Sequence, residues 1–286
     1  MSKYISLFLY LILAPFIGAF LDGIDRKITA RMQGRKGPSI WQPFYDLFKL
    51  FSKQMIAVNS VQLLLNCSYL IFLAIAGGMV FLGTDILMSL FILSTADMFL
   101  ILAASSDSSP FSNIGASREM MQMMSYEPMT LLIAVGFYLA TGSFRVDEII
   151  VQDSAAIWMM PGLFVGYILI MAIKLRKSPF DLSTSHHAHQ EVVKGITTEM
   201  SGPTLAIMEI GEYYEKILLL AVVALFFIHG TFWSWILGIV ACLAVYFIEI
   251  LIDNISARVN WRKLLDICWL ITLLCGGINV LILMLI

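Results

Sequence analysis

Long stretches of mainly apolar residues recur along this 286-residue sequence, and they constrain its fold more than any other feature. A helix needs about 20 such residues to cross the hydrocarbon core of a bilayer. With 59% hydrophobic and only 13% charged residues, the chain has more apolar side chains than a water-soluble domain of this size could bury. The same composition excludes disordered, fibrous and disulfide-rich folds. Windows of suitable length predict eight membrane spans, at 4–22, 63–82, 86–105, 128–142, 157–175, 203–229, 233–252 and 264–286.

We therefore predict an all-α polytopic membrane protein in which residues 1–286 form a single integral membrane domain. The windows near 130–141 and 157–173 are short, so their helices are expected to extend into less apolar flanks. Most of the 18 Lys and Arg residues fall in the connections on one side. Basic loops are usually retained in the cytoplasm, so both termini are expected outside and the chain in the cell membrane. The predicted cytoplasmic loops are 23–62, 106–127, 174–202 and 253–263.

Net charge and cysteine spacing narrow the possible ligands. A net charge of −2 gives no reason to expect a nucleic-acid partner. The four cysteines lie singly within apolar stretches and form no C-x-x-C pair. We therefore expect neither a thiolate-bound metal nor an iron–sulfur cluster in this chain.

An amphipathic helix is predicted at 42–55, inside the first long loop. Its aromatic and aliphatic residues recur at helical spacing, while Asp46, Lys49 and Lys53 form the opposite face. Pro43 is suited to the first turn of a helix. Such a helix is expected to lie in the headgroup plane of the bilayer, as an interfacial anchor.

Acidic residues inside the predicted spans are the strongest functional signal. A carboxylate is costly in hydrocarbon, so it must face a polar interior. The span 203–229 carries Glu209, Glu212, Glu215 and Lys216, and the four-residue spacing of Glu212 and Lys216 favours an ion pair along one helical face. Such a row can pass protons between buried groups, although a static ion-paired network that only joins helices is the alternative. Further acids in or beside the spans are Asp97, Glu127, Glu249 and Asp253.

Three of the four histidines lie close together in the loop 174–202. They are His186, His187 and His189, and Glu191 follows them. Their spacing matches no zinc motif, so no metal site is expected here. We interpret them as groups that relay protons or form hydrogen bonds to a docked partner.

Three segments resemble the NADH dehydrogenase subunit 1 family, the H-subunits of respiratory complex I. All three lie in the predicted cytoplasmic loops, in the order found in that family, and the resemblance covers nearly the whole chain. The segments are Asp25-Arg26-Lys27 with Arg31 to Pro38 and Gln42 to Leu50; Gly115 to Glu119 with Ser125 to Pro128; and Pro179 to Leu182 with Glu191 to Val193 and Thr198 to Gly202.

Departures from the complex I pattern indicate a particular branch of the family. The Gly/Pro segment of the first loop is shortened to residues 39–41, and a histidine-rich run at 183–190 replaces a run of glutamates. Lys174 stands where a glutamate is typical. The pattern most closely resembles the EchB-type membrane subunits of energy-converting [NiFe] (Ech-type) hydrogenases.

The resemblance implies a membrane subunit that anchors a peripheral arm and couples its redox reaction to ion movement. The implied partners are the hydrogenase large and small subunits, an iron–sulfur subunit, an antiporter-like membrane subunit and, through the complex, ferredoxin. The [NiFe] centre and the [4Fe–4S] clusters would belong to those partners. Proton-path positions implied by motif are Glu127, Glu191, Glu199 and Glu212, to which the pattern of the span 203–229 adds Glu209, Glu215 and Lys216. Interface positions are Arg35, Lys36, Asp46, Arg118, Asp181, His186, His187 and His189.

Two other functions fit parts of this sequence. The first is the quinone-site subunit of a complex I-type NADH dehydrogenase, although the altered positions surround the quinone chamber of that family. The second is a stand-alone secondary ion transporter, for which the glycine pairs at 77–78 and 276–277 are weak support because paired glycines more often allow close helix packing.

Overall fold

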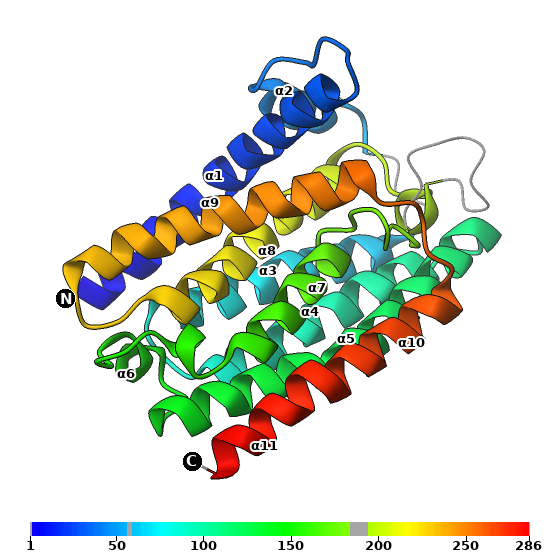
Figure 1. Ribbon diagram of the computed structural model, residues 1–286. Helices are drawn as coiled ribbons and strands as arrows, with labels where there is room; N and C mark the ends of the chain where they lie inside the picture. Colours follow the sequence, from blue (N-terminus) through cyan, green and yellow to red (C-terminus); the bar gives the residue numbers. More distant parts are fainter. Residues whose placement is uncertain (1, 56–58, 184–193, 286) are drawn as a thin grey trace.

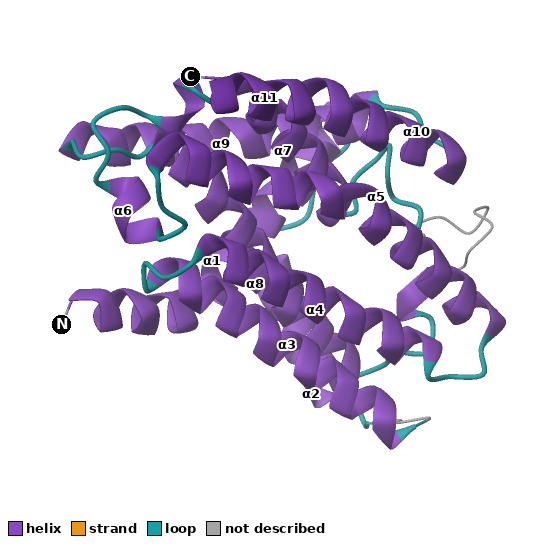
Figure 2. Ribbon diagram, turned by 90° about the horizontal axis from the view of Figure 1, so that it is seen from below, coloured by secondary structure: helices purple, strands orange, loops and turns teal. Residues whose placement is uncertain are grey.

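A computed structural model describes residues 2–55, 59–183 and 194–285 as a bundle of α-helices, with no strand in this part of the chain. Both termini lie at one end of the bundle, together with α6 (Val146–Ile150), and α2 (Gln42–Ser52) lies at the other end (Figures 1 and 2). The long connections that carry most of the basic residues are therefore gathered at the end far from the termini.

Six helices of the described residues are long and apolar enough to cross a membrane. They establish a multi-pass membrane protein and coincide with six of the eight predicted spans. They are α1 (Ser2–Met32), α3 (Ser60–Phe81), α4 (Ile86–Ser105), α5 (Pro110–Thr141), α9 (Phe232–Ile255) and the run from α10 (Trp261–Ile271) through η3 (Thr272–Gly277) to α11 (Ile278–Leu285).

The two remaining predicted spans correspond to α7 (Pro161–Lys174) and α8 (Pro203–Phe227). At a rise of about 1.5 Å per residue, the 14 residues of α7 are too short to cross a hydrocarbon core of about 30 Å. The 25 residues of α8 are long enough, but the helix carries Glu209, Glu212, Glu215 and Lys216. Both helices lie inside the bundle (Figure 1), and the count of eight spans stays a prediction for these two.

Predicted loops are wrong in part where helix continues into them. In the loop 253–263, α9 continues to Ile255 and α10 already begins at Trp261. The loop 23–62 begins as helix, since α1 continues to Met32, and residues 110–127 of the loop 106–127 belong to α5, as the expected extension of the span 128–142 requires. The polar residues of the added turns have partners within the protein: Glu119 pairs with Arg176, and Gln122 donates to the Phe180 carbonyl at 2.5 Å. A helix does not need apolar residues all round when its polar side chains are satisfied inside the protein.

The prediction that span 157–175 extends beyond its window is wrong, because α7 begins only at Pro161 after the short turn η1 (Ala156–Trp158). Asn279 on α11 caps this start, since its Oδ1 accepts from the backbone N–H groups of Gly162 at 2.9 Å and Leu163 at 3.2 Å. Its Nδ2 donates to the Met159 carbonyl at 3.0 Å. A helix start inside a membrane protein needs such partners because no water satisfies it there.

The predicted helix at 42–55 forms as α2, which ends at Ser52. It lies beside α1, where the rings of Phe16 and Phe44 stack with centroids 6.2 Å apart, while Phe48 and Phe51 are exposed. Polar end caps explain why other boundaries agree with the sequence. Asp85 accepts from the N–H of Leu87 at 2.8 Å and so starts α4 at the predicted residue.

Candidate functional site

A cavity of about 1000 Å³ opens among the helix ends at the basic side of the bundle. The second half of α1, the loop after it, the end of α7 with the segment after it, the start of α8 and the end of α9 line this cavity. More than half of the lining residues are charged. We call this space the charged cavity.

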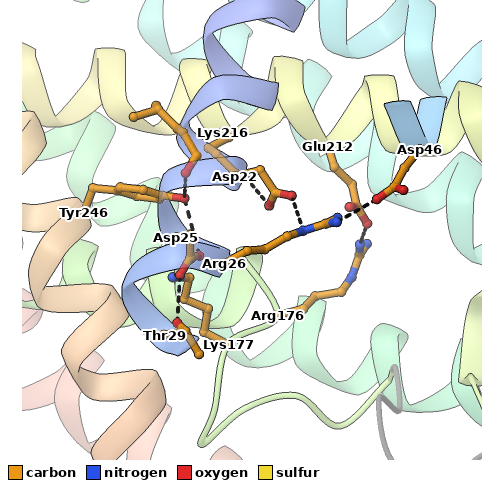
Figure 3. A network of polar contacts seen from close by, with 11 residues as sticks. Asp22, Asp25, Arg26, Thr29, Asp46, Arg176, Lys177, Glu212, Lys216 and Tyr246 are labelled. Atoms are coloured by element: carbon orange, nitrogen blue, oxygen red, sulfur yellow. Dashed lines mark hydrogen bonds and ion pairs between the residues drawn. The ribbon is translucent and has the colours of Figure 1, made fainter. Parts of the chain in front are cut away.

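Helix α8 places four predicted path residues at the charged cavity: Glu209, Glu212, Glu215 and Lys216. The predicted pair between Glu212 and Lys216 is wrong, because each side chain has a partner from another element. Lys216 Nζ lies 3.0 Å from Asp22 Oδ1 on α1, and Glu212 pairs with Arg176 (Figure 3). Segments distant in sequence compete with a local pair once the helices pack.

A close approach of α1 to α8 explains the pair between Asp22 and Lys216. At Gly18 on α1, an added Cβ would lie 2.6 Å from the Cβ of Tyr213, so only glycine fits there. Asp22 follows Gly18 by one helical turn and Lys216 follows Tyr213 by three residues, so both side chains lie beside this contact. Helix packing therefore sets this ion pair.

The second half of α1 carries charges that the sequence pattern did not place in the path. Arg26 Nε lies 3.0 Å from Asp22, and its Nη1 lies 2.8 Å from Asp46 on α2. Asp25 accepts from Lys177 Nζ at 2.7 Å (Figure 3). Asp25 and Arg26 were visible in the first family segment, but the assumed end of the first span at residue 22 left them in a loop.

The deepest charged group joins α4, α7 and α8. Lys174 pairs with Asp97 and lies 3.1 Å from Glu215 Oε1, and each of the three side chains is at most 6% exposed. Tyr126 donates to Asp97 Oδ2 at 2.8 Å, and Tyr69 lies 3.5 Å from Glu215 Oε2. The residue that departs from the complex I pattern is therefore the cation of a buried cluster.

Arg176 lies at the wall of the charged cavity, near this cluster. Its guanidinium pairs with Glu212 and lies 3.2 Å from Glu119 on α5, and its backbone has a φ of +50°. Burial alone lowers the pKa of a guanidinium, but the carboxylates of Glu119 and Glu212 outweigh it, so the pKa of Arg176 lies well above its usual value. From the sequence alone, Arg176 was counted only as a basic loop residue, although two carboxylates surround it in the structure.

The predicted interface residues fall into three groups. Arg35 and Lys36 are exposed at the rim of the charged cavity. Asp46, Arg118 and Asp181 make contacts within the chain: Asp46 to Arg26, Arg118 to the Leu182 carbonyl at 3.4 Å, and Asp181 to Arg258 at 2.7 Å. His186, His187, His189 and the path residue Glu191 lie outside the described residues.

Glu127 and Glu199 do not line the charged cavity. Glu127 is half-buried on α5, and its carboxylate has no polar side-chain partner in the part of the chain that the structure describes. Glu199 follows the short turn η2 (Gly195–Thr197), near Asp107. Burial and the charge of Glu199 raise the pKa of Asp107, and a hydrogen bond from Gln62 opposes this rise. The structure thus brings together the α8 residues of the predicted path, but not these two glutamates.

Glu209 and Glu249 each bury carboxylate oxygen without a hydrogen bond from the described residues. This holds for Oε2 of Glu209 and for both oxygens of Glu249. In the same part of the chain, no three His, Cys, Asp or Glu side chains are placed to hold a metal ion. What the arrangement can do chemically is hold and exchange protons among acids and bases that line one space.

Comparison with known proteins gives consistent results over nearly the whole chain. The NADH dehydrogenase family matches residues 5–284. Hydrogenase-4 component C of Escherichia coli is 29% identical over 274 residues, covering 87% of this chain and 86% of that protein. The H-type subunit of the NADH-quinone oxidoreductase of Rhodospirillum rubrum is 27% identical over 293 residues, covering 90% of this chain and 86% of that one.

A solved structure shows the same fold. One chain of the membrane-bound sulfane sulfur reductase, an archaeal respiratory membrane complex, superposes with a TM-score of 0.83, covering 99% of this chain and 100% of that chain. The sequence identity is 22%, so this likeness bears on the fold alone.

Proposed function

Because this chain belongs to the NADH dehydrogenase family, as a membrane subunit of complex I-like or hydrogenase-4-like oxidoreductase complexes, we propose that it serves an energy-converting [NiFe] hydrogenase. In this proposal it anchors a peripheral arm at the end of the bundle that carries α2, which faces the cytoplasm. It couples ferredoxin-linked H2 evolution or oxidation in that arm to movement of H+ or Na+. The [NiFe] centre and the [4Fe–4S] clusters belong to partner subunits.

One observation supports the proposal most: groups of ion-paired side chains lie around the charged cavity, and one of them, which reaches the buried Asp97, contributes Lys174 and Glu215 to its lining. These groups join α1, α2, α4, α5, α7, α8 and the segment after α7. Opposite charges a few ångströms away shift a carboxylate's proton affinity by roughly one to three pKa units. Coupled groups of this kind titrate together.

A quinone-site function is less favoured by the same space. Ligand pockets for largely apolar molecules are lined mainly by hydrophobic and aromatic side chains. Here charged side chains predominate, and the sequence departs from complex I around this region. Quinone-dependent turnover of the purified complex would favour the complex I-type function, and we expect none.

Subunit composition is the first test. The chain, purified in mild detergent from its native membrane, should retain a nickel-bearing subunit and iron–sulfur subunits with an antiporter-like membrane protein. Metal analysis and mass spectrometry measure this. A flavin-containing NADH-oxidising arm in their place would contradict the hydrogenase assignment, and ion transport by the chain alone in liposomes would favour the stand-alone transporter.

Coupling is the second test. Glu212→Gln and Glu199→Gln should leave dye-linked hydrogenase activity largely intact, because the soluble arm keeps its centres, and should abolish gradient formation in inverted vesicles. Glu148→Gln is the control, since Glu148 is an exposed residue at the opposite end of the bundle. Normal gradients in both Glu212→Gln and Glu199→Gln would remove these residues from the mechanism.

A further inference from the structure

Lys174 and the two carboxylates that it contacts form a buried group whose charges do not cancel. Asp97, Lys174 and Glu215 would carry a net charge of −1 if all were ionised, and their side chains are 6%, 4% and 4% exposed. An unbalanced charge is strongly disfavoured in such surroundings. The group therefore needs one further positive charge.

The surrounding groups do not supply that charge. Three tyrosines are neutral neighbours, and Arg176 is already shared between Glu119 and Glu212. Lys174 and Arg176 carry two positive charges. The four carboxylates Asp97, Glu119, Glu212 and Glu215 would carry four negative charges, so the combined net charge would be −2. The titratable groups that face the cluster are Tyr69 on α3, Glu119 and Tyr126 on α5, Tyr167 on α7, Arg176 after α7, and Glu212 on α8.

We propose that Asp97, Lys174 and Glu215 form a one-proton store in which the two carboxylates share a single proton beside the Lys174 ammonium. This inference rests on the proposed function only for the store's role in coupling. Asp97 Oδ2 accepts hydrogen bonds from both the Lys174 ammonium and the Tyr126 hydroxyl. Glu215 Oε1 is buried and lies 3.1 Å from Lys174 Nζ, so the ammonium stands between the two carboxylates.

The same geometry selects a proton over Na+. A sodium ion needs several oxygen ligands around one point, whereas the Lys174 ammonium already occupies the space between the two carboxylates. A proton needs only one carboxylate oxygen. Lys174 and Glu215 line the charged cavity and Asp97 does not, so the proton exchanges with water on the Glu215 side.

A close helix contact holds the Glu215 side of the store in place. At Gly211 on α8, an added Cβ would lie 2.4 Å from Cε1 of Tyr69, whose hydroxyl lies 3.5 Å from Glu215 Oε2. Tyr69 is fully buried. The tyrosine therefore closes the apolar side of the store and leaves the cavity side as its opening.

Infrared spectroscopy of the purified complex tests the store directly. A protonated carboxyl group has a C=O stretch that is separate from the carboxylate bands and shifts in D2O. We expect Asp97→Asn and Glu215→Gln each to remove the same single-carboxyl band, because either change leaves one carboxylate balanced by Lys174. The double variant should remove no more than either single variant. Loss of the band in only one single variant, or in neither, would overturn the shared store.

Lys174→Met provides a further variant in case one carboxyl variant fails to assemble. Without the ammonium, both carboxyl groups should be protonated and the band should double; an unchanged band would overturn the proposal. Asp147→Asn is the control, since Asp147 pairs with Lys3 at the other end of the bundle. Replacing choline chloride by NaCl should leave the band unchanged, and loss of the band in NaCl would overturn the assignment to a proton. Because these spectra need no nickel-bearing partner, a failed hydrogenase assignment would appear in the subunit composition and not here.

Discussion

Arg176 shows at the scale of one residue how a charge can organise a loop. Its side chain is 9% exposed, it joins carboxylates from α5 and α8, and its left-handed backbone is one that non-glycine residues rarely adopt. Backbone strain of this kind persists only where surrounding contacts hold it. The chain just after α7 is therefore anchored by this guanidinium at the wall of the charged cavity.

Removing this guanidinium should be costly. Arg176→Gln leaves Glu119 and Glu212 facing each other without a cation, and breaking a buried ion pair in this way costs about 3 kcal/mol. The thermal unfolding of the purified protein in detergent measures the loss. Arg145→Gln is the control. Within the described residues the ion pairs of Arg145 are exposed and long, at 3.8 Å, so this substitution should cost less than about 1 kcal/mol. Equal effects of the two changes would contradict the structural role of Arg176.

Asp107 predicts a pH dependence of stability. Burial and Glu199 raise its pKa in the folded chain, so its contribution to stability is fully present below the unfolded pKa, about 4, and is lost as the pH rises through the folded pKa. Asp107→Asn still accepts the bond from Gln62 but carries no charge. Relative to the unchanged chain, the variant should therefore gain stability as the pH rises from about 4 to about 8.

Unfolding curves across this pH range measure that difference. Asp153→Asn, at an exposed loop residue near α6, is the matched control and should follow the unchanged chain. A difference between Asp107→Asn and the unchanged chain that is constant with pH would contradict the electrostatic explanation.

At the scale of the element, the start of α7 depends on a side chain from another helix. This helix is short, begins inside the bundle and has its first N–H groups satisfied by Asn279. The π-helical turn η3 lies just before Asn279 in the last span. It packs so closely on the start of α7 that a Cβ added at Gly162 would lie 2.5 Å from the carbonyl oxygen of Cys275. The irregular turn and the glycine together bring Asn279 to the start of α7.

Loss of this cap should destabilise the protein measurably. Asn279→Ala leaves two N–H donors and the Met159 carbonyl without partners, and a buried unsatisfied polar group costs about 1–3 kcal/mol. Thermal unfolding in detergent is the measurement. Leu281→Ala on the same helix is the control, because Leu281 is 61% exposed on the outer face of the bundle. A larger loss for Leu281→Ala than for Asn279→Ala would contradict the capping role.

At the scale of the whole molecule, the arrangement separates a small-loop end from a charged end. The termini and α6 lie at the first end and α2 lies at the second (Figure 1). The charged cavity is lined by the second half of α1, the ends of α7 and α9 and the start of α8. Basic loops are retained in the cytoplasm. The charged end is therefore predicted to face the cytoplasm.

Cysteine labelling tests this orientation. In a chain without its four native cysteines, Asp153→Cys should react with a membrane-impermeant maleimide in intact cells. Ala257→Cys, in the loop between α9 and α10, should react only in inverted vesicles. Both positions are exposed, so burial does not explain a difference between them. The reverse pattern would contradict the proposed orientation.

The sequence was sufficient for features that depend on local composition. The length of the apolar stretches predicted the membrane helices. A polar N-cap such as Asp85 allowed the first residue of α4 to be predicted correctly. The row of charges on α8 was visible because a carboxylate in an apolar stretch stands out against its neighbours. Where helix continues through polar residues, the same reasoning ended α1 too early and began α5 too late.

Pairings between side chains required the packed bundle. Lys216 meets Asp22 across 194 positions of the chain, and Lys174 meets Asp97 across 77, so no periodicity within one helix predicts them. Lys216 pairs with Asp22 and not with its local neighbour Glu212, because the close helix contact at Gly18 brings the Asp22 carboxylate to it. The sequence shows where charged residues occur in a membrane protein, but the packing of distant helices decides which of these charges pair. The reason is that electrostatic attraction depends on separation in space and not on separation along the chain.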